Sequence, residues 1–533
     1  MTSGRKTVLL IGILLCLGAA VYFNSIDGPL FWDDEVTVVQ NVYIRQPLKF
    51  LGDIFSSSYH SGSGEVLNFY RPVATLSFAL DYRIWGLKAT GYHLTSVILH
   101  LLNGVLIFLL LKKLFKNPWI SFLSAALFLV HPINSEAVNY VSNRTDLLML
   151  FFFLSAFYLY LMYKKQQKGI WLAGSLGLYV CSVLSKEIGL VLPLFLLSAE
   201  MLFFKEKKQI KVILGFGVIF VLYGILRATS LNFLNINILV DGAQADPYSR
   251  DLFFRTFIFG KVFMTYLRLF FVPVNLHMEY DMPELLSPID ITAFLGVLGF
   301  LGMSAGIFCL CRNRKEMQFG QLWFILGLFP ISGIIPINNV VSEHYLYLAS
   351  TGFFVIISAM AVNFGLKNKA VFVKYGTIAL GVLVITLLSV TTHKRNKDWQ
   401  DPLTMYLDIA GTTKNSFRAH NNAGVEYYRK ENFNQAEKFF RSSLDILPTY
   451  GEALNNLGVI YEGKKQYNEA EKLYKECLKN KPGYILAHKN LVKIYLRANK
   501  RGEAKAQVQK VLQYHPYDEE ALQMLEQMEK YGY

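Results

Sequence analysis

Charged side chains are scarce in this sequence. Asp, Glu, Lys and Arg together make up 17% of its 533 residues, whereas soluble domains contain roughly 25%. Hydrophobic residues account for 53% of the chain, so a soluble fold of this length would lack a polar surface. The composition therefore excludes an ordinary soluble protein and predicts a membrane protein.

Cysteine is also scarce, and metal-binding motifs are missing. The five cysteines show no spacing typical of a disulfide framework or a structural metal site. His131 and His344 do not follow the HExxH spacing of zinc enzymes. No zinc site is predicted, and the involvement of a divalent ion is left open because the sequence does not require one.

The net charge of +14 does not indicate nucleic-acid binding, because Lys and Arg gather in short clusters between apolar runs. Such clusters mark the cytoplasmic ends of membrane spans. Lys394, Arg395 and Lys397, just beyond the last apolar run, depart from this pattern. The clusters that define the cytoplasmic side are Arg5-Lys6, Lys112 to Lys116, Lys164 to Lys168, Lys205 to Lys211, Arg312 to Lys315, and Lys367 with Lys369.

Apolar runs close to the ~20 residues that cross a bilayer predict an all-α bundle of about eleven spans. The first run is predicted as an uncleaved span, since no clear signal-peptidase site follows it. Residues 1–392 form this transmembrane domain, with a first external loop at 24–91 and a second at 229–289. The predicted spans are 7–23, 92–111, 118–131, 146–163, 170–185, 188–204, 211–228, 290–311, 319–335, 344–364 and 371–391.

The segment 253–271 admits two interpretations. It is apolar enough to span, yet it carries Arg255, Lys261 and Arg268. If this segment were a span, every later segment would face the opposite side of the membrane, and Arg312 to Lys315 would lie outside. We therefore expect an amphipathic helix on the outer membrane surface.

The C-terminal part repeats with a period of 34 residues. Five kinds of position stay in phase, which is typical of the paired helices of tetratricopeptide (TPR) repeats. After a linker at 393–415, residues 416–533 are predicted to form an α-solenoid of three repeats, enough to stack a continuous core. The positions in phase are Asn422, Asn456 and Asn490; Tyr427, Tyr461 and Tyr495; Ala436, Ala470 and Ala504; Leu444, Leu478 and Leu512; and Pro448, Pro482 and Pro516.

Three consecutive carboxylates, Asp33, Asp34 and Glu35, follow the first predicted span. Mutual repulsion near a membrane surface tends to raise at least one pKa, which would suit a general base or a metal site. The simpler interpretation is a solvated acidic turn whose aspartate caps the following helix. The spacing alone favours the simpler one.

Other polar side chains lie at the predicted external ends of the spans, where charge near lipid calls for a reason. Arg71 could hold a phosphate in a planar fork of donors, or could reach the headgroup level as a surface arginine. Taken together, the residues predict a polar chamber on the same side as the acidic triplet. Its further members are His131, Glu136, Arg144, Asp146, Lys186, Glu187, Glu343 and His344.

The order of these motifs resembles that of the TMTC-type (transmembrane and TPR) O-mannosyltransferases, which belong to the GT-C superfamily of multi-span glycosyltransferases. The shared features run from Asp33-Asp34 through Tyr70-Arg71-Pro72 and Ser185-Lys186-Glu187 to Ile335-Pro336 and the repeats, so they cover essentially the whole chain. His344 stands where the family more often has Arg, and three repeats are fewer than in eukaryotic members.

The resemblance implies transfer of a sugar, such as mannose, from a polyprenyl- or dolichyl-phosphate donor to a hydroxyl, with protein Ser or Thr as the expected acceptor. Asp33 or Asp34 would be the general base of an inverting displacement, and Arg71, Arg144 and Lys186 would hold the leaving phosphate. The repeats would bind the acceptor on the non-cytoplasmic side. That side faces outward from a prokaryotic plasma membrane, or into the lumen of the endoplasmic reticulum in a eukaryote.

Three other functions fit parts of the sequence. A membrane-anchored TPR scaffold for envelope or glycan machinery would explain the repeats, although an anchor needs one span and no polar chamber. A transporter would place ionisable groups at mid-membrane rather than at span ends. A glycan polymerase or ligase acting on lipid-linked chains is barely separable from a protein glycosyltransferase by sequence.

Overall fold

The computed structural model describes residues 3–64, 68–204, 209–229, 251–280, 290–310, 314–334, 340–413 and 415–530. Within these ranges every regular element is a helix and no strand occurs, which confirms the predicted all-α class. The chain forms two compact units. The first, here the membrane unit, contains the N-terminal segment to Leu30, Pro47–Tyr59 and Asn68–Gln400. The second, the repeat unit, contains Phe31–Gln46, a segment beginning at His60, and the chain from Asp401.

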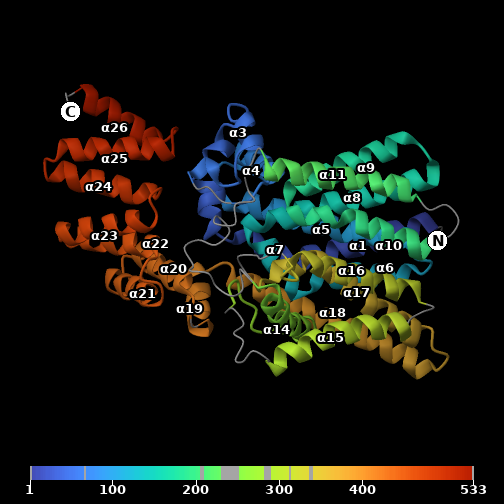
Figure 1. Ribbon diagram of the computed structural model, residues 1–533. Coiled ribbons are helices and arrows are strands. Elements are labelled where there is room, and N and C mark those ends of the chain that lie inside the picture. The colour runs from blue at the N-terminus through green and yellow to red at the C-terminus, as the bar shows by residue number, and fades with distance from the viewer. Residues whose placement is uncertain are drawn as a thin grey trace. The chain divides into compact units, whose positions relative to one another are not determined.

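In the membrane unit, long helices lie side by side in a bundle (Figure 1). Each of the eleven predicted spans overlaps one of them. Six helical stretches in the described ranges are long and apolar enough to cross a membrane, and the other predicted spans coincide with helices that are not among these six. The helices are α1 (Ser3–Tyr22), α5 (Ala89–Leu114), α6 (Pro118–Val130), α8 (Arg144–Gln166), α9 (Gly169–Ser185), α10 (Leu192–Phe203), α11 (Ile210–Ala228), α14 (Leu252–Phe271), α15 (Ile291–Leu310), α16 (Lys315–Leu328), α17 (Leu346–Met360) and α18 (Val371–Asp398).

Small and hydroxylated residues bring these helices together. The Ser182 hydroxyl of α9 donates to the Met149 carbonyl of α8 at 2.9 Å, which is an inter-helix hydrogen bond of the kind that membrane bundles use. Helices α16 and α17 cross where Gly320 faces Gly352, and a Cβ at either position would lie within 2.8 Å of the other's carbonyl oxygen. Only glycine permits this approach.

The segment predicted to lie on the membrane surface forms α14, which packs along α15. Gly260 and Gly296 face each other at the crossing, and Arg255 donates to the Gly333 carbonyl at 2.5 Å. The placement of α14 at the membrane surface stays a prediction. Two parts of the predicted second external loop, 230–250 and 281–289, lie outside the described residues, as do Ile335-Pro336 and parts of the basic clusters at 205–211 and 312–315.

Short elements connect the spans and carry the polar residues. In the membrane unit these are η1 (Phe23–Asp27), α3 (Leu51–Ser56), α4 (Pro72–Trp85), η4 (Pro132–Asn134), α7 (Ser135–Asn139), η5 (Val141–Asn143), η6 (Glu187–Val191), η7 (Phe329–Ile331), η8 (Glu343–Tyr345) and η9 (Ala361–Leu366). The predicted linker at 393–415 is largely helical, because α18 continues to Asp398 and α19 (Pro402–Thr412) follows.

The repeat unit contains three helix pairs, which confirms the predicted repeats (Figure 1, orange to red). The in-phase alanines Ala436, Ala470 and Ala504 are fully buried, as expected where the two helices of a repeat approach closely. The first loop adds η2 (Glu35–Val39), α2 (Val42–Arg45) and η3 (Ser61–Ser63) to this unit. The helix pairs of the repeats are α20 (Phe417–Arg429) with α21 (Phe433–Ile446), α22 (Gly451–Gly463) with α23 (Tyr467–Asn480), and α24 (Ile485–Arg497) with α25 (Arg501–Tyr514), followed by α26 (Glu519–Lys530).

Candidate active site

Glu136 and His344 form the centre of a buried polar cluster in the membrane unit. The Glu136 carboxylate, on α7, is hydrogen-bonded to Nδ1 of His344 at 2.6 Å and accepts from the His344 backbone N–H at 3.1 Å. Asn143 donates to the same carboxylate at 3.1 Å. Burial raises the pKa of Glu136 to about 7, although the hydrogen bonds from the His344 backbone N–H and from Asn143 act in the opposite direction. The carboxyl can therefore exchange a proton near neutral pH.

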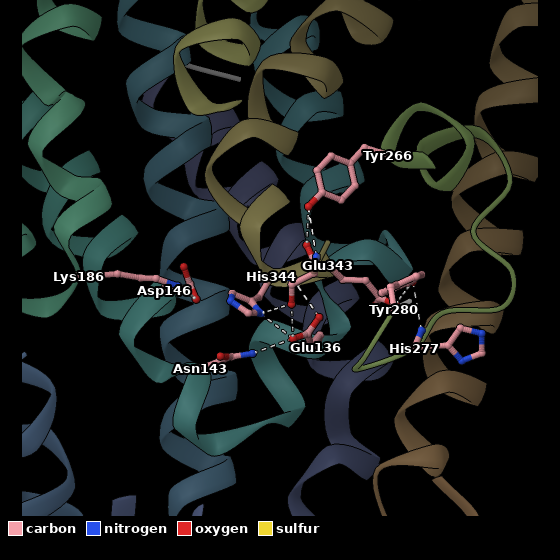
Figure 2. Close-up of polar contacts among 10 residues, drawn as sticks. Glu136, Asn143, Asp146, Lys186, Tyr266, His277, Tyr280, Glu343 and His344 are labelled. Carbon is pink, nitrogen blue, oxygen red and sulfur yellow. Dashed lines mark hydrogen bonds and ion pairs between the residues drawn. The ribbon is translucent and has the colours of Figure 1, made fainter. Parts of the chain in front are cut away.

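A buried ion pair lies beside this centre. Lys186 follows α9 directly, and its Nζ is 2.7 Å from a carboxylate oxygen of Asp146 in the first turn of α8. Both side chains are buried. Burial lowers the pKa of Lys186, and the negative charge of Asp146 offsets part of this effect. Figure 2 shows this pair on one side of Glu136 and His344.

Glu343 occupies the other side of the cluster (Figure 2). The Tyr280 hydroxyl donates to Glu343 Oε1 at 2.7 Å. Within the part of the chain that the structure describes, the second carboxylate oxygen of Glu343 is buried without a hydrogen-bond partner. Tyr266 of α14 fixes the adjacent backbone, since its hydroxyl contacts both the N–H and the carbonyl of Ser342 at 3.2 Å. A buried acceptor that lacks a donor is suited to a ligand hydroxyl.

Arg71 extends the cluster towards α4. Its guanidinium lies 3.1 Å from Glu187 and 4.5 Å from the centre of the Phe69 ring. Burial alone would raise the pKa of Glu187, but the charge and hydrogen bond of Arg71 hold it at about 2. The charges of Asp146 and Lys186 also act on this ion pair, so the two pairs belong to one site.

Two predicted members of the chamber have their contacts elsewhere. Arg144 is completely buried, 2.6 Å from Asp81, and donates to the Tyr92 carbonyl at 2.7 Å. His131 contacts the Phe270 carbonyl at 3.0 Å and packs against the rings of Phe270 and Phe354. Both side chains are buried, and the roles predicted for them stay predictions.

Arg395, near the end of α18, is a residue that sequence reasoning missed. Only 9% of its surface is exposed, and its Nη1 donates to Asp398 at 3.1 Å. Its Nε and Nη2 have no partner among the described residues, while its charge acts on both Glu136 and Glu343. The sequence signal was present, because Lys394, Arg395 and Lys397 violate the charge pattern of the spans.

The acidic triplet belongs to the repeat unit. Asp34 is completely buried, and its carboxylate accepts from the backbone N–H of Phe31 at 3.3 Å. Asp33 is exposed. Glu35 pairs with Arg429 of α20 at 2.8 Å. The three neighbouring carboxylates therefore have three different environments.

The repeats contain a cavity of about 310 Å³. It offers imidazole, amide and ammonium groups beside aromatic rings. His488 on its wall is oriented by hydrogen bonds to Gln507 at 2.6 Å and to the Pro482 carbonyl at 2.9 Å. Across the described residues as a whole, no three His, Cys, Asp or Glu side chains gather as a metal site would require. The cavity is lined by Lys475, Leu478, Pro482, His488, Leu491, Tyr495, Gln507, Lys510 and Tyr514.

Comparisons with known proteins match both units. The family model described as dolichyl-phosphate-mannose-protein mannosyltransferase matches residues 71–226, and two models described as tetratricopeptide repeat match 415–482 and 463–528. Protein O-mannosyl-transferase TMTC3 of Homo sapiens is 27% identical over 485 residues, which cover 83% of this chain and 52% of that protein. Protein O-mannosyl-transferase F38B6.6 of Caenorhabditis elegans is 26% identical over 462 residues, covering 82% and 63% respectively.

The predicted resemblance to the TMTC-type proteins is confirmed. The chain spans about half the length of the human relative and less than two thirds of the length of the Caenorhabditis elegans relative. With its long apolar helices and its similarity to these transferases, it is an integral membrane protein with C-terminal TPR repeats.

Two solved structures illustrate the result of the structural comparison. ArnT from Cupriavidus metallidurans, bound to undecaprenyl phosphate, has a TM-score of 0.41 and 12% identity, covering 96% of this chain and 81% of that chain. The archaeal oligosaccharyltransferase AglB from Archaeoglobus fulgidus, in complex with an inhibitory peptide and a dolichol-phosphate, has a TM-score of 0.41 and 14% identity, covering 81% and 59%.

Proposed function

We propose that this chain is a membrane glycosyltransferase that moves a sugar, mannose in the first instance, from a polyprenyl- or dolichyl-phosphate donor to a hydroxyl of a protein Ser or Thr. The match of the mannosyltransferase family model to residues 71–226 carries the proposal. That range contains Arg71, Glu136, Asp146 and Lys186, which meet in one buried cluster. The transferase activity printed in the names of the relatives supports the same reaction.

The donor phosphate would bind to Arg71 and Lys186. Each already has a carboxylate partner, so an incoming phosphate would share the cation with Glu187 or Asp146. Arg71 keeps a buried Nε–H without a partner within the described ranges, which leaves a donor for a phosphate oxygen. Arg144 was a third candidate, and its Nε also lacks a partner among the described residues, but it pairs with Asp81, which is more deeply buried than Glu187 and favours a structural role.

The chemical step is a single inverting displacement. The acceptor oxygen attacks the anomeric carbon, the bond from that carbon to the phosphate oxygen breaks, and the lipid phosphate leaves with its electron pair. An aspartate of the first loop takes the acceptor proton. The exposed carboxylate of Asp33 suits this role better than the buried Asp34, whose oxygen already accepts from Phe31. The cationic side chains stabilise the leaving phosphate.

The acceptor segment would lie on the repeats, whose cavity combines rings with polar groups. The ion pair between Glu35 and Arg429 supports one shared compartment for the acidic loop and the repeats. We assign this compartment to the non-cytoplasmic side. A reporter fused after residue 400 tests the assignment, since activity of a cytosol-specific reporter there contradicts it.

The decisive experiment is incubation of membranes containing the chain with a panel of labelled lipid-phosphate sugars, followed by mass spectrometry of the products. A peptide that gains one hexose on Ser or Thr supports the proposal. Growth of a lipid-linked glycan instead indicates a polymerase or ligase. No transfer from any donor, while the repeats still capture partner proteins, indicates a scaffold.

A further inference from the structure

The acidic segment of the first loop has a backbone that needs support. Trp32 adopts a left-handed conformation with φ of 58°, which is unfavourable for a bulky side chain. The next turn is a π-helix, Glu35–Val39. This geometry is rare in proteins, and where it occurs it often lies at a functional site. A segment of this kind holds one conformation only when its surroundings determine it.

Helix α19 supplies part of this support. Tyr406 is buried, and its ring centre lies 5.4 Å from that of Trp32 and 6.1 Å from that of Phe31. The charges of Asp33 and Asp34 act on the Tyr406 hydroxyl. The aromatic contact therefore fixes the two residues that precede the candidate base, and it places the base beside α19.

Helix α20 holds the other end of the triplet. Arg429, its last residue, places Nη2 at 2.8 Å from Glu35 and Nη1 at 2.8 Å from Glu426 of the same helix. Glu426 thus orients the guanidinium that holds Glu35. A half-exposed ion pair adds little to overall stability, but this one determines the direction of a side chain two positions after Asp33.

A separate contact holds the later part of the loop. The left-handed Gly64 lies against α24 and the end of α25, where an added Cβ would be 2.8 Å from Ile485 Cδ1 and 3.6 Å from the His515 ring. Thr37 and His60 join the two loop pieces through a hydrogen bond of 3.2 Å. The loop therefore packs against the repeat helices at more than one place.

We propose that Arg429 and Tyr406 of the repeat unit are positioning residues, which hold the Asp33 carboxylate in its working orientation. This inference rests on the proposed function, and it gives the repeats a task beyond acceptor binding. A general base must lie within hydrogen-bond reach of its proton. Release of the loop would therefore slow the chemical step and leave donor binding unchanged.

A charge exchange tests this proposal in the full chain. The variants are Arg429→Glu, Glu35→Arg and the double variant, in which the ion pair is restored with opposite polarity. Glu35→Arg changes the loop alone and leaves the pair between Arg429 and Glu426 intact. Arg441→Glu is the matched control, because Arg441 is a half-exposed arginine in α21 that pairs with Glu437 and, within the described part of the chain, forms no ion pair or hydrogen bond with the loop.

Two measurements separate this inference from the proposed function. Hydrogen exchange reports the protection of amides 31–40. Transfer from labelled dolichyl-phosphate mannose to a Ser/Thr-rich peptide gives kcat and the donor KM. We expect each single variant to speed exchange and to lower kcat by about 10- to 100-fold at unchanged donor KM. The double variant should recover both quantities, and Arg441→Glu should change neither.

The proposal is overturned if the single variants keep wild-type exchange and kcat, or if the double variant behaves no better than the singles. A wild-type chain that transfers no sugar refutes the proposed function instead. In that case the exchange data still decide whether Arg429 holds the acidic segment.

Discussion

Nδ1 of His344 lies 2.6 Å from Oε1 of Glu136, although 208 residues separate the two in the chain. The bond joins the short helix after α6 to the turn before α17. The site is therefore assembled from distant connections of the bundle.

The raised pKa of Glu136, about 7 because of its burial, predicts a pH-dependent stability. A carboxyl whose pKa rises on folding binds its proton more tightly in the folded state. Its contribution is therefore complete below the unfolded value of 4.5 and declines as pH rises towards about 7. Glu136→Gln should remove this decline, which is on the order of 1–3 kcal/mol. Melting temperatures in detergent from pH 4 to 8 measure it, and equal pH slopes for variant and wild type would contradict the prediction.

The ion pair of Lys186 and Asp146 allows structure and function to be separated. Lys186→Met leaves a buried carboxylate without its cation and should cost about 3–5 kcal/mol. Adding Asp146→Leu should restore most of this stability. The double variant should nevertheless fail to use the donor, because the phosphate has lost its ammonium group. Thermal melts and transfer assays check both expectations, and an active double variant would exclude Lys186 from donor binding.

Arg71 and Arg144 should respond differently to the same substitution. Arg71→Ala should raise the donor KM roughly 10- to 100-fold, the effect of one lost charged hydrogen bond. Arg144→Ala leaves Asp81 buried without its cation and should destabilise the fold by about 3–5 kcal/mol. Donor titrations and thermal melts distinguish the two effects. A stable Arg144→Ala protein with a raised donor KM would reverse the assignment.

Substitutions of Asp33 and Asp34 should also have different effects. Asp33→Asn should lower kcat by about 100- to 10,000-fold at unchanged melting temperature, as expected for loss of a general base. Asp34→Asn should lower the melting temperature, because the buried carboxylate fixes the turn at Phe31. Asp445→Asn, at an exposed aspartate of α21, is the control. Full kcat in Asp33→Asn would remove Asp33 from the mechanism.

Features that depend on local periodicity could be predicted from the sequence. The 34-residue phase of Ala436, Ala470 and Ala504 required close helix contacts, and these alanines are buried as expected. The apolar runs likewise predicted the helices of the bundle. In both cases the information is a pattern along the sequence, either the apolar run of one helix or the recurrence of one position in every repeat.

Ion-pair partners could not be predicted, because they depend on how each helix is rotated in the bundle. Lys186 stands beside Glu187 in the sequence, yet it pairs with Asp146, 40 residues earlier. Arg144 stands two residues from Asp146 and pairs with Asp81. The sequence predicts a surface cation at Arg395, because it follows an apolar run. In the structure the packing of α18 buries it. The assignment of Asp33, Asp34 and the phosphate ligands stays a prediction.

The crossing of Gly320 and Gly352 connects the packing of two helices to the geometry of the candidate site. Helix α17 leads directly from the turn that carries Glu343 and His344, and an added methyl at Gly352 would meet the Gly320 carbonyl at 2.5 Å. Displacing α17 sideways would carry the imidazole out of register with its carboxylate. We therefore expect a conservative Gly-to-Ala change between these two helices to abolish turnover, although it alters no residue of the site itself.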